Sequence, residues 1–137
     1  MEQHNRISRK PAIVVGKAEH ERLTALAELA MASNPHVADA LIGELERARI
    51  KADNRMDPHV VRMGSTVEYT TDSGETRKVT LVFPADADIA EGKVSILTPV
   101  GTALLGLSPG QSIDWRARDG KRHRLTIGQV TCAEVVG

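Results

Sequence analysis

One stretch of the chain decides its fold, and it reads Val94-Ser95-Ile96-Leu97-Thr98-Pro99-Val100-Gly101-Thr102-Ala103-Leu104-Leu105-Gly106-Leu107-Ser108-Pro109-Gly110. Residues 94–97 alternate polar and apolar side chains, as a half-buried strand does, and Pro99 ends that strand. Residues 100–107 are apolar enough to form a helix that lies on a sheet, and Gly106 and the Pro109-Gly110 pair end it. A strand, one short buried helix and a return to strand predict an α+β domain, in which a single helix plugs one open end of a curved sheet.

The composition limits the kinds of partner that the chain can bind. At 137 residues, it is long enough for one domain, or for one compact domain with a small appendage. Its aromatic rings are Tyr69, Phe83 and Trp115, too few for the stacking surface that single-stranded nucleic acid requires. The formal net charge is zero, so any attraction to DNA or to a membrane has to be local. We therefore expect no sequence-specific contact with nucleic acid.

The sequence also indicates a compartment. Cys132 is the one cysteine, which excludes an internal disulfide and fits a reducing environment. No apolar run approaches the roughly 20 residues of a membrane span. Residues 1–10 lack the apolar centre of a signal peptide. We expect a cytoplasmic protein without a membrane partner.

The amino-terminal part predicts a helical hairpin. Residues 1–16 form a basic leader, with Arg6, Arg9 and Lys10, and then a short extended segment. Residues 17–52 carry two helical patterns, the first ending near residue 32 and the second near residue 50 or 51. Their apolar stripes are Leu23, Leu26 and Ala30, with Leu29 beside them, and Val37, Leu41, Leu45 and Ala48. The tight turn between the helices predicts an antiparallel hairpin, a short finger that has to lean on the sheet domain or on a partner.

Local signals mark the ends and the solvent side of these helices. Gly16 is placed to cap the first helix, with Glu19 near its positive end. Asn34 is placed to cap the second helix, with Pro35 at its first position. Acid–base pairs expected on the solvent side are Glu44 with Arg47 and Glu46 with Arg49.

The carboxy-terminal part predicts a β domain. Residues 53–58 are a linker, and residues 59–137 carry alternating patterns separated by turn signals at residues 72–74 and 119–120. The expected strands are residues 66–71, 77–83, 94–97, 112–117 and 122–136, mostly antiparallel. Gly128 allows a bulge or bend in the last strand.

Residues 95–106, followed by Gly110, resemble the signature of the carboxy-terminal domain of the Gre transcript-cleavage factors. With a short helical hairpin ahead of that signature, the chain most fully resembles the Rnk branch of this family, whose name stands for regulation of nucleoside diphosphate kinase. The resemblance extends from about residue 11 onwards. It implies an FKBP-like fold for residues 59–137, a short coiled-coil finger before it, and binding to bacterial RNA polymerase.

The resemblance also implies a docking site. Gre factors dock near the rim of the polymerase secondary channel through an Asp-Ser-Pro just before the helix. The positions in register here are Leu97, Thr98 and Pro99, which we call the docking link. Pro99 matches, Thr98 keeps the hydroxyl, and Leu97 lacks the carboxylate, so docking is expected in an altered form.

The finger tip departs from the family at the residues that carry its chemistry. The Gre coiled coil has an acidic pair at its tip, which supplies oxygens to a catalytic magnesium ion inside polymerase. The contact residues offered by this tip are Ser33, Asn34, His36 and Asp39. Glu28 and Asp39 are the nearest acids to the turn, and they lie on separate helices. A carboxylate such as Asp39 near a helix amino end is favoured by the helix dipole in any case, so its presence alone indicates no contact. We expect no transcript cleavage and no catalytic residue.

Other reactive side chains favour structural interpretations. The histidines are His4, His20, His36, His59 and His123, and they have no ligand spacing, so we expect no metal and no cofactor. Cys132 is expected as a buried packing thiol, and residues 100–107 as core rather than as a ligand groove. A basic turn consists of Arg116, Arg118, Lys121, Arg122 and Arg124. It could bind an acidic protein surface or phosphate, but a solvated hairpin edge is favoured.

The leading functional hypothesis is a non-catalytic regulator that binds RNA polymerase near the secondary channel and competes with Gre factors. One alternative is a protein-interaction module that acts directly on nucleoside diphosphate kinase. Another is a peptidyl-prolyl isomerase, which the fold suggests but which three scattered rings disfavour. The sequence leaves the oligomeric state and the direction of the finger open.

Overall fold

The computed structural model describes residues 11–117 and 119–132. The basic leader residues Arg6, Arg9 and Lys10 and the turn residue Arg118 lie outside this part of the chain, so the expectations about them are untested. None of the helices in the described part is long and apolar enough to cross a membrane.

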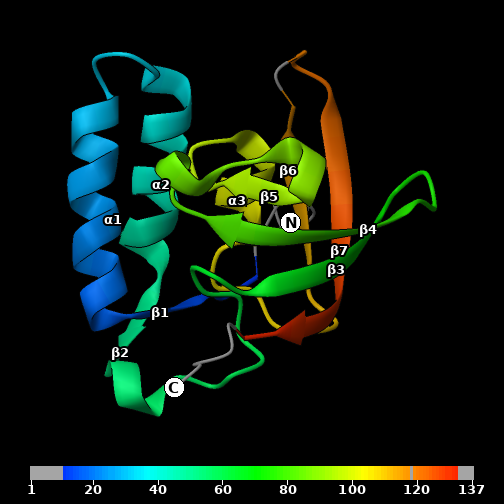
Figure 1. The fold of residues 1–137 in the computed structure, drawn as a ribbon, viewed down its shortest axis with the longest axis horizontal. Helices are drawn as coiled ribbons and strands as arrows, with labels where there is room; N and C mark the ends of the chain where they lie inside the picture. The colour runs from blue at the N-terminus through cyan, green and yellow to red at the C-terminus, as the bar shows by residue number, and fades with distance from the viewer. Residues whose placement is uncertain (1–10, 118, 133–137) are drawn as a thin grey trace, which may run out of the picture.

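Two antiparallel helices form the amino-terminal hairpin, and they stand side by side in Figure 1. These are α1 (Lys17–Ala30) and α2 (Pro35–Arg47), joined by a turn at residues 31–34. Leu23 of α1 and Leu41 of α2 are fully buried, and the His20 Nε2 atom lies 2.9 Å from the carbonyl oxygen of Leu45. Leu29, expected beside the apolar stripe, is instead 79% exposed.

The second helix is shorter than its sequence pattern predicts. It ends at Arg47, the backbone of Ala48 is extended, and Arg49–Lys51 forms strand β2. This strand pairs in parallel with β1 (Val14–Gly16), and the Arg49 amide donates to the carbonyl of Ile13 at 2.9 Å. Pairing with a distant β-prone segment therefore replaced the last helical turn, because it satisfies the same backbone groups.

A five-stranded sheet forms the carboxy-terminal part. Its strands are β3 (Thr66–Thr71), β4 (Thr76–Val82), β5 (Lys93–Ser95), β6 (Ser112–Arg116) and β7 (Arg122–Thr131), in the order β5-β4-β3-β7-β6. All neighbouring pairs are antiparallel except β4 with β5. Short 3-10 turns, Asp53–Arg55 (η2), Pro84–Asp86 (η3) and Ile89–Glu91 (η4), lie in the connections. The α+β class and the five mostly antiparallel strands predicted from the sequence are confirmed. Strand β5 ends at Ser95, before the expected residue 97, and β7 ends at Thr131, while the expected strand beyond residue 132 lies outside the described residues.

The bend expected at Gly128 is present as an irregularity between β3 and β7. The register shifts between Val67, which pairs with Val130, and Tyr69, which pairs with Ile127. A Cβ atom on Gly128 would lie 3.2 Å from the carbonyl oxygen of Glu68. A glycine at this position therefore lets the two backbones approach at the bulge.

Helix α3 (Pro99–Leu104) connects the hairpin to the sheet. It packs against α2 and β6, and Leu104, Leu105 and Leu107 are at most 1% exposed. The helix ends earlier than expected, because Leu105 has left the helical conformation, with a ψ of 129°, and Gly106 takes a φ of 79°. That left-handed turn places the Gly106 carbonyl 3.2 Å from the amide of Val14, on the incoming strand β1.

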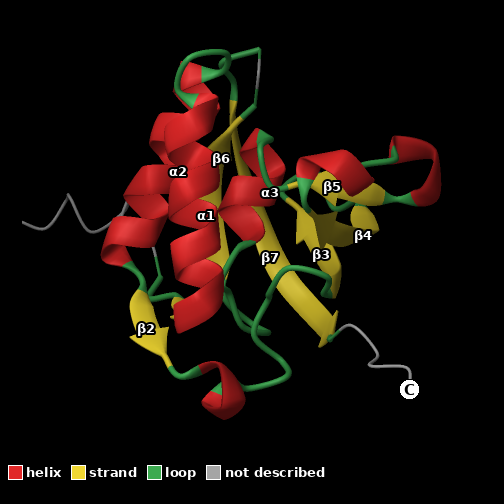
Figure 2. Ribbon diagram, turned by 60° about the vertical axis from the view of Figure 1, so that its left-hand side comes forward, coloured by secondary structure: helices red, strands yellow, loops and turns green. Residues whose placement is uncertain are grey.

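The hairpin lies against the sheet domain and shares one core with it, and Figure 2 shows α1, α2 and α3 on one side of the sheet. Buried side chains of α1 and α2 belong to the same cluster as those of β3, β4, β6 and β7. At the edge of this contact, the Arg22 guanidinium lies 4.4 Å from the centre of the Phe83 ring. The finger therefore folds back along the domain over much of its length.

Candidate functional site

The docking link is shaped by one hydroxyl group. Thr98 is the N-cap of α3, and its Oγ1 accepts a hydrogen bond from the Gly101 amide at 3.1 Å and donates one to the Ser95 carbonyl at 2.7 Å. The side chains of Leu97, Thr98 and Pro99 are all half-buried. The Thr98 hydroxyl thus serves the local fold, which leaves Leu97 and the Pro99 ring as the freer contact surfaces of the link.

At the hairpin tip, three of the four expected contact residues are open to solvent. Ser33, His36 and Asp39 are exposed and Asn34 is half-buried. Asn34 is the N-cap of α2 and Pro35 its first residue, as expected, but the Asn34 side chain makes no capping hydrogen bond. Its amide group is therefore available to neighbouring elements.

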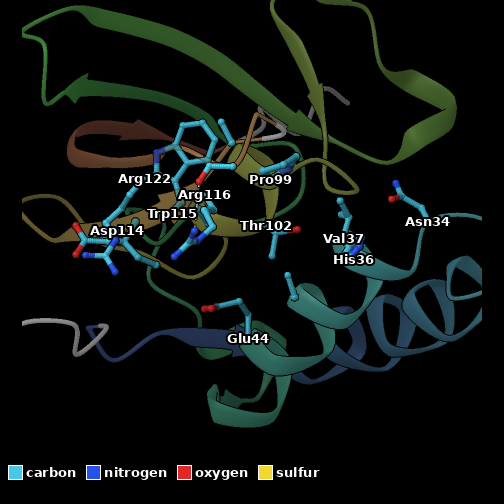
Figure 3. A pocket seen from close by; sticks show the side chains of 15 residues that line it. Asn34, His36, Val37, Glu44, Pro99, Thr102, Asp114, Trp115, Arg116 and Arg122 are labelled. Atoms are coloured by element: carbon cyan, nitrogen blue, oxygen red, sulfur yellow. Dashed lines mark hydrogen bonds between the residues drawn. The ribbon is translucent and has the colours of Figure 1, made fainter. Parts of the chain in front are cut away.

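A groove runs between α2, α3 and the β6–β7 hairpin (Figure 3). Its volume is about 830 Å³, within the range of small-ligand and peptide sites. The lining residues are Asn34, His36, Val37, Ala40, Glu44, Pro99, Thr102, Ala103, Ile113, Asp114, Trp115, Arg116, Ala117, Gly120 and Arg122. One side of α3 therefore faces a groove, whereas the sequence predicted only core packing for it.

Residues from three regions that the sequence singled out separately line this groove. Asn34 and His36 come from the tip, Pro99 from the docking link, and Arg116 and Arg122 from the basic turn. The other tip and link residues, Ser33, Asp39, Leu97 and Thr98, do not line it. One residue of the docking link and two residues of the tip therefore line the same groove.

Sequence reasoning missed the groove because its walls come from distant segments. One signal was available: alternation along β6 puts Ile113 and Trp115 on the same face of the sheet. That face had no assigned neighbour until α2 and α3 were placed beside it. Val37 and Ala40, one turn apart on α2, form the opposite wall.

Glu44 contradicts its expected place on the solvent side of α2. Its pair with Arg47 is present, with Oε1 2.9 Å from Nε and 2.8 Å from an Nη atom, but Glu44 is 3% exposed. It lies one helical turn after Ala40, on the side of α2 that lines the groove. Arg47 also donates to the Pro11 carbonyl at 2.5 Å, so the buried carboxylate is held beside a fixed cation.

The basic turn carries two unneutralised cations at the groove rim. Arg116 and Arg122 are direct cross-strand partners and both are exposed. In the described part of the chain, neither guanidinium lies within ion-pair distance of a carboxylate. Asp114 is paired with Arg124 at 3.1 Å.

Trp115 forms the wall of the groove beneath these arginines. Its ring centre is 5.2 Å from that of His123, at an interplanar angle of 31°. Its Nε1 atom is buried and has no hydrogen-bond acceptor among the described residues. An indole N–H without an acceptor is unusual in a buried position, and a bound partner could supply one.

A second charged cluster secures the base of the hairpin. The Asp53 carboxylate, in the linker, accepts the Ala18 amide at 3.0 Å, which caps α1 in place of the side chain that Gly16 lacks. Arg62 lies 3.6 Å from Glu19 and 3.7 Å from Asp53. Burial raises the pKa of the Glu19 carboxyl, and the Arg62 guanidinium offsets part of that rise. Glu19 therefore has a structural role, since it helps to hold the base of the hairpin.

Cys132 contradicts its expected burial. It is exposed, since β7 ends at Thr131 and the strand alternation places Val130 in the core. Among residues 11–117 and 119–132, no group of three or more His, Cys, Asp or Glu side chains is arranged to hold a metal ion.

Comparison with known proteins matches both halves of the chain. Residues 56–131 match the family described as "Transcription elongation factor, GreA/GreB, C-term", and residues 11–50 match "Rnk N-terminus". The chain is 37% identical over 119 residues to the "Regulator of nucleoside diphosphate kinase" of Escherichia coli K12, covering 86% of this chain and 88% of that protein. It is 48% identical over 74 residues to the transcription elongation factor GreA of Nitratidesulfovibrio vulgaris, covering 53% of this chain and 44% of that protein.

A solved structure supports the same relationship. "Prokaryotic transcription elongation factor GreA/GreB from Nitrosomonas europaea" superposes with a TM-score of 0.69 at 41% identity, covering 89% of this chain and 99% of that one. A GreA/GreB-type carboxy-terminal domain behind a short helical hairpin defines the class. The chain belongs to the Rnk branch of the GreA/GreB family, as its sequence signature predicted.

Proposed function

We propose that this protein is a non-catalytic regulator that binds bacterial RNA polymerase in the cytoplasm, docks near the secondary channel and competes there with Gre factors. The observation that carries the proposal is the placement of the docking link. The family signature resides in residues 95–106, and Thr98 holds the link rigidly at the start of α3 through two hydrogen bonds. A rigid, half-buried loop at the mouth of a groove is a suitable docking element, since little entropy is lost when it binds.

The hairpin supports the absence of transcript cleavage in this proposal. Its tip presents the hydroxyl, amide and imidazole groups of Ser33, Asn34 and His36, where Gre factors present paired carboxylates. At about 1.5 Å per residue, helices of 14 and 13 residues span only about 20 Å. The hairpin also packs along the sheet domain instead of projecting from it.

Direct binding to polymerase tests the proposal. Purified protein is titrated into labelled core polymerase, and then competed with a Gre factor whose transcript cleavage is followed in the same reaction. We expect micromolar or tighter binding, together with inhibition of cleavage by the Gre factor and no cleavage by this protein alone. Absence of binding at micromolar concentrations, or cleavage in the absence of a Gre factor, would refute it.

Variants at Leu97 and Pro99, whose side chains do not form the helix cap, test whether polymerase contacts the docking link. Leu97→Asp restores the carboxylate of the family motif, and Pro99→Ala removes the ring that matches it. We expect L97D to strengthen polymerase binding and P99A to weaken it, while Thr98→Ser, which retains the cap, leaves it unchanged. Equal polymerase affinities for all three variants would show that polymerase contacts another part of the molecule.

A second candidate function follows from the name of the 37%-identical relative, which is a regulator of nucleoside diphosphate kinase. Under this alternative, the protein contacts that kinase directly. Co-purification with nucleoside diphosphate kinase in the absence of polymerase would favour it over the first proposal. The isomerase alternative finds little support, because Trp115 is the one Phe, Tyr or Trp among the described residues that line the groove.

A further inference from the structure

The groove beside the docking link has a chemical character of its own. We propose that it receives a short acidic segment of RNA polymerase, which seats one apolar side chain on the groove floor and places a carboxylate between Arg116 and Arg122. This inference rests on the proposed function, because it names the part of that partner that enters the groove. It adds a second contact to the docking link, formed jointly by the hairpin and the sheet domain.

Charge is the first reason to expect an acidic occupant. Arg116 and Arg122 are directly opposite each other on neighbouring strands, and like charges in this position destabilise a hairpin. Asp114, the acid that lines the same rim, is already paired with Arg124. A carboxylate held between the two guanidinium groups would remove the repulsion and form charge-assisted hydrogen bonds.

The floor of the groove is the second reason, and it favours a peptide over a free anion. The groove is lined by five aliphatic side chains, namely Val37 and Ala40 on the α2 wall, and Pro99, Ala103 and Ile113. Phosphate sites are usually built from converging backbone amides at a glycine-rich turn or a helix end. An apolar floor with cations at one rim instead matches a peptide in which an acidic residue lies next to an aliphatic or aromatic one.

The Trp115 indole is the third reason. Its buried Nε1–H has no acceptor among the described residues, although the rest of the ring is packed against neighbours. A main-chain carbonyl of a peptide in the groove would accept this hydrogen bond once the side chains that cover Nε1 shift aside. Pro99 lines the groove and also belongs to the docking link, so a polymerase segment that contacts Pro99 lies at the edge of the groove (Figure 3).

Charge reversal tests the cationic rim. The variant combines Arg116→Glu with Arg122→Glu, and its control is Lys121→Glu, which changes a cation of the same turn that does not line the groove. We expect the double variant to bind core polymerase about ten-fold or more weakly than the wild type, and K121E to bind within about three-fold. The wild-type affinity should also fall as salt rises, and that of the double variant should change much less.

Steric blocking tests access to the groove by an independent route. Ala40→Trp fills the groove from an exposed position on α2, and Ala25→Trp makes the same change at an exposed position of α1 outside the groove. We expect A40W to weaken polymerase binding about ten-fold, A25W to leave it unchanged, and both to melt near the wild-type temperature.

Crosslinking from the groove identifies the segment that enters it. Ala40→Cys in a Cys132→Ser background offers a single thiol, which is labelled with a short photoreactive group and irradiated in the complex with core polymerase. We expect the crosslinked polymerase peptide to contain an acidic residue next to an aliphatic or aromatic one. A crosslinked peptide without an acidic residue would show that the assigned chemistry is wrong.

The binding outcomes separate the two proposals. Wild-type binding that neither the double charge reversal nor A40W weakens would overturn the groove inference and leave the proposed function intact. An equal loss of affinity in K121E or A25W would also overturn it, since the effect would not be specific to the groove. Failure of the wild-type protein to bind polymerase would refute the proposed function and the groove contact with it.

Discussion

Removing the Thr98 hydroxyl tests whether the docking link is held by the cap that the structure shows. In Thr98→Ala, the Gly101 amide loses its acceptor and the Ser95 carbonyl loses its donor. The loss of an N-cap costs about 1 kcal/mol, and a second half-buried hydrogen bond costs about 0.5–1.5 kcal/mol. We therefore expect the free energy of unfolding to fall by about 1.5–2.5 kcal/mol.

Thermal and urea unfolding measure this loss. For a chain of this length, each kcal/mol lowers Tm by roughly 3–5 °C, so T98A should melt about 5–12 °C below the wild type. Thr98→Ser retains the donor and acceptor and should melt within about 2 °C of it. A T98A protein as stable as T98S would show that the hydroxyl does not hold the link. Polymerase affinity should follow the same order, with T98S close to the wild type.

Three further predictions concern stability and exposure. Burial raises the folded-state pKa of the Glu19 carboxyl above its unfolded-state pKa. The wild type should therefore lose stability as the pH rises from the unfolded-state pKa to the folded-state pKa of this group. Glu19→Gln should remove this loss in urea unfolding from about pH 4 to 7, and an unchanged pH slope would contradict it. Gly106→Ala should lower the free energy of unfolding by at least about 2 kcal/mol, since φ is 79° and the added Cβ would lie 2.7 Å from the Cβ of Ile13. Gly43→Ala, with open space around it, should stabilise α2 by about 0.5–1 kcal/mol. Equal melting temperatures for the two variants would refute the packing around Gly106. Cys132→Ser should leave Tm unchanged, and the native thiol should react with a disulfide reagent as fast as in denaturant, whereas slow native reaction would indicate burial.

Much of the fold followed from local patterns. Val67 and Tyr69 are buried on one face of β3, as their alternation predicted, and the turn at residues 72–74 joins β3 to β4. Pro35 was confirmed as the first residue of α2, whereas Pro99, which was expected to end a strand, is the first residue of α3. These features were predictable because the side-chain period and the φ preference of proline act within a few residues.

Expectations about the candidate site were less complete. The docking link and the hairpin tip were named from a family signature and remain proposed contacts. Glu44 and Arg47 are three residues apart and do pair, but the burial of Glu44 depended on what covers that side of α2. The same applies to Thr98, whose hydroxyl looked like a docking group and is a helix cap.

The sequence by itself determined the elements of this protein: two short helices, antiparallel strands with turns at glycine, and the signature that assigns the chain to its family. The tertiary structure decided which surfaces these elements share. It paired β1 with β2 where a helical turn was expected, turned the Cys132 thiol to solvent, and enclosed a groove between Ala40 and Trp115. Local geometry is set by neighbouring residues, whereas a groove exists only once segments far apart in the chain have packed together.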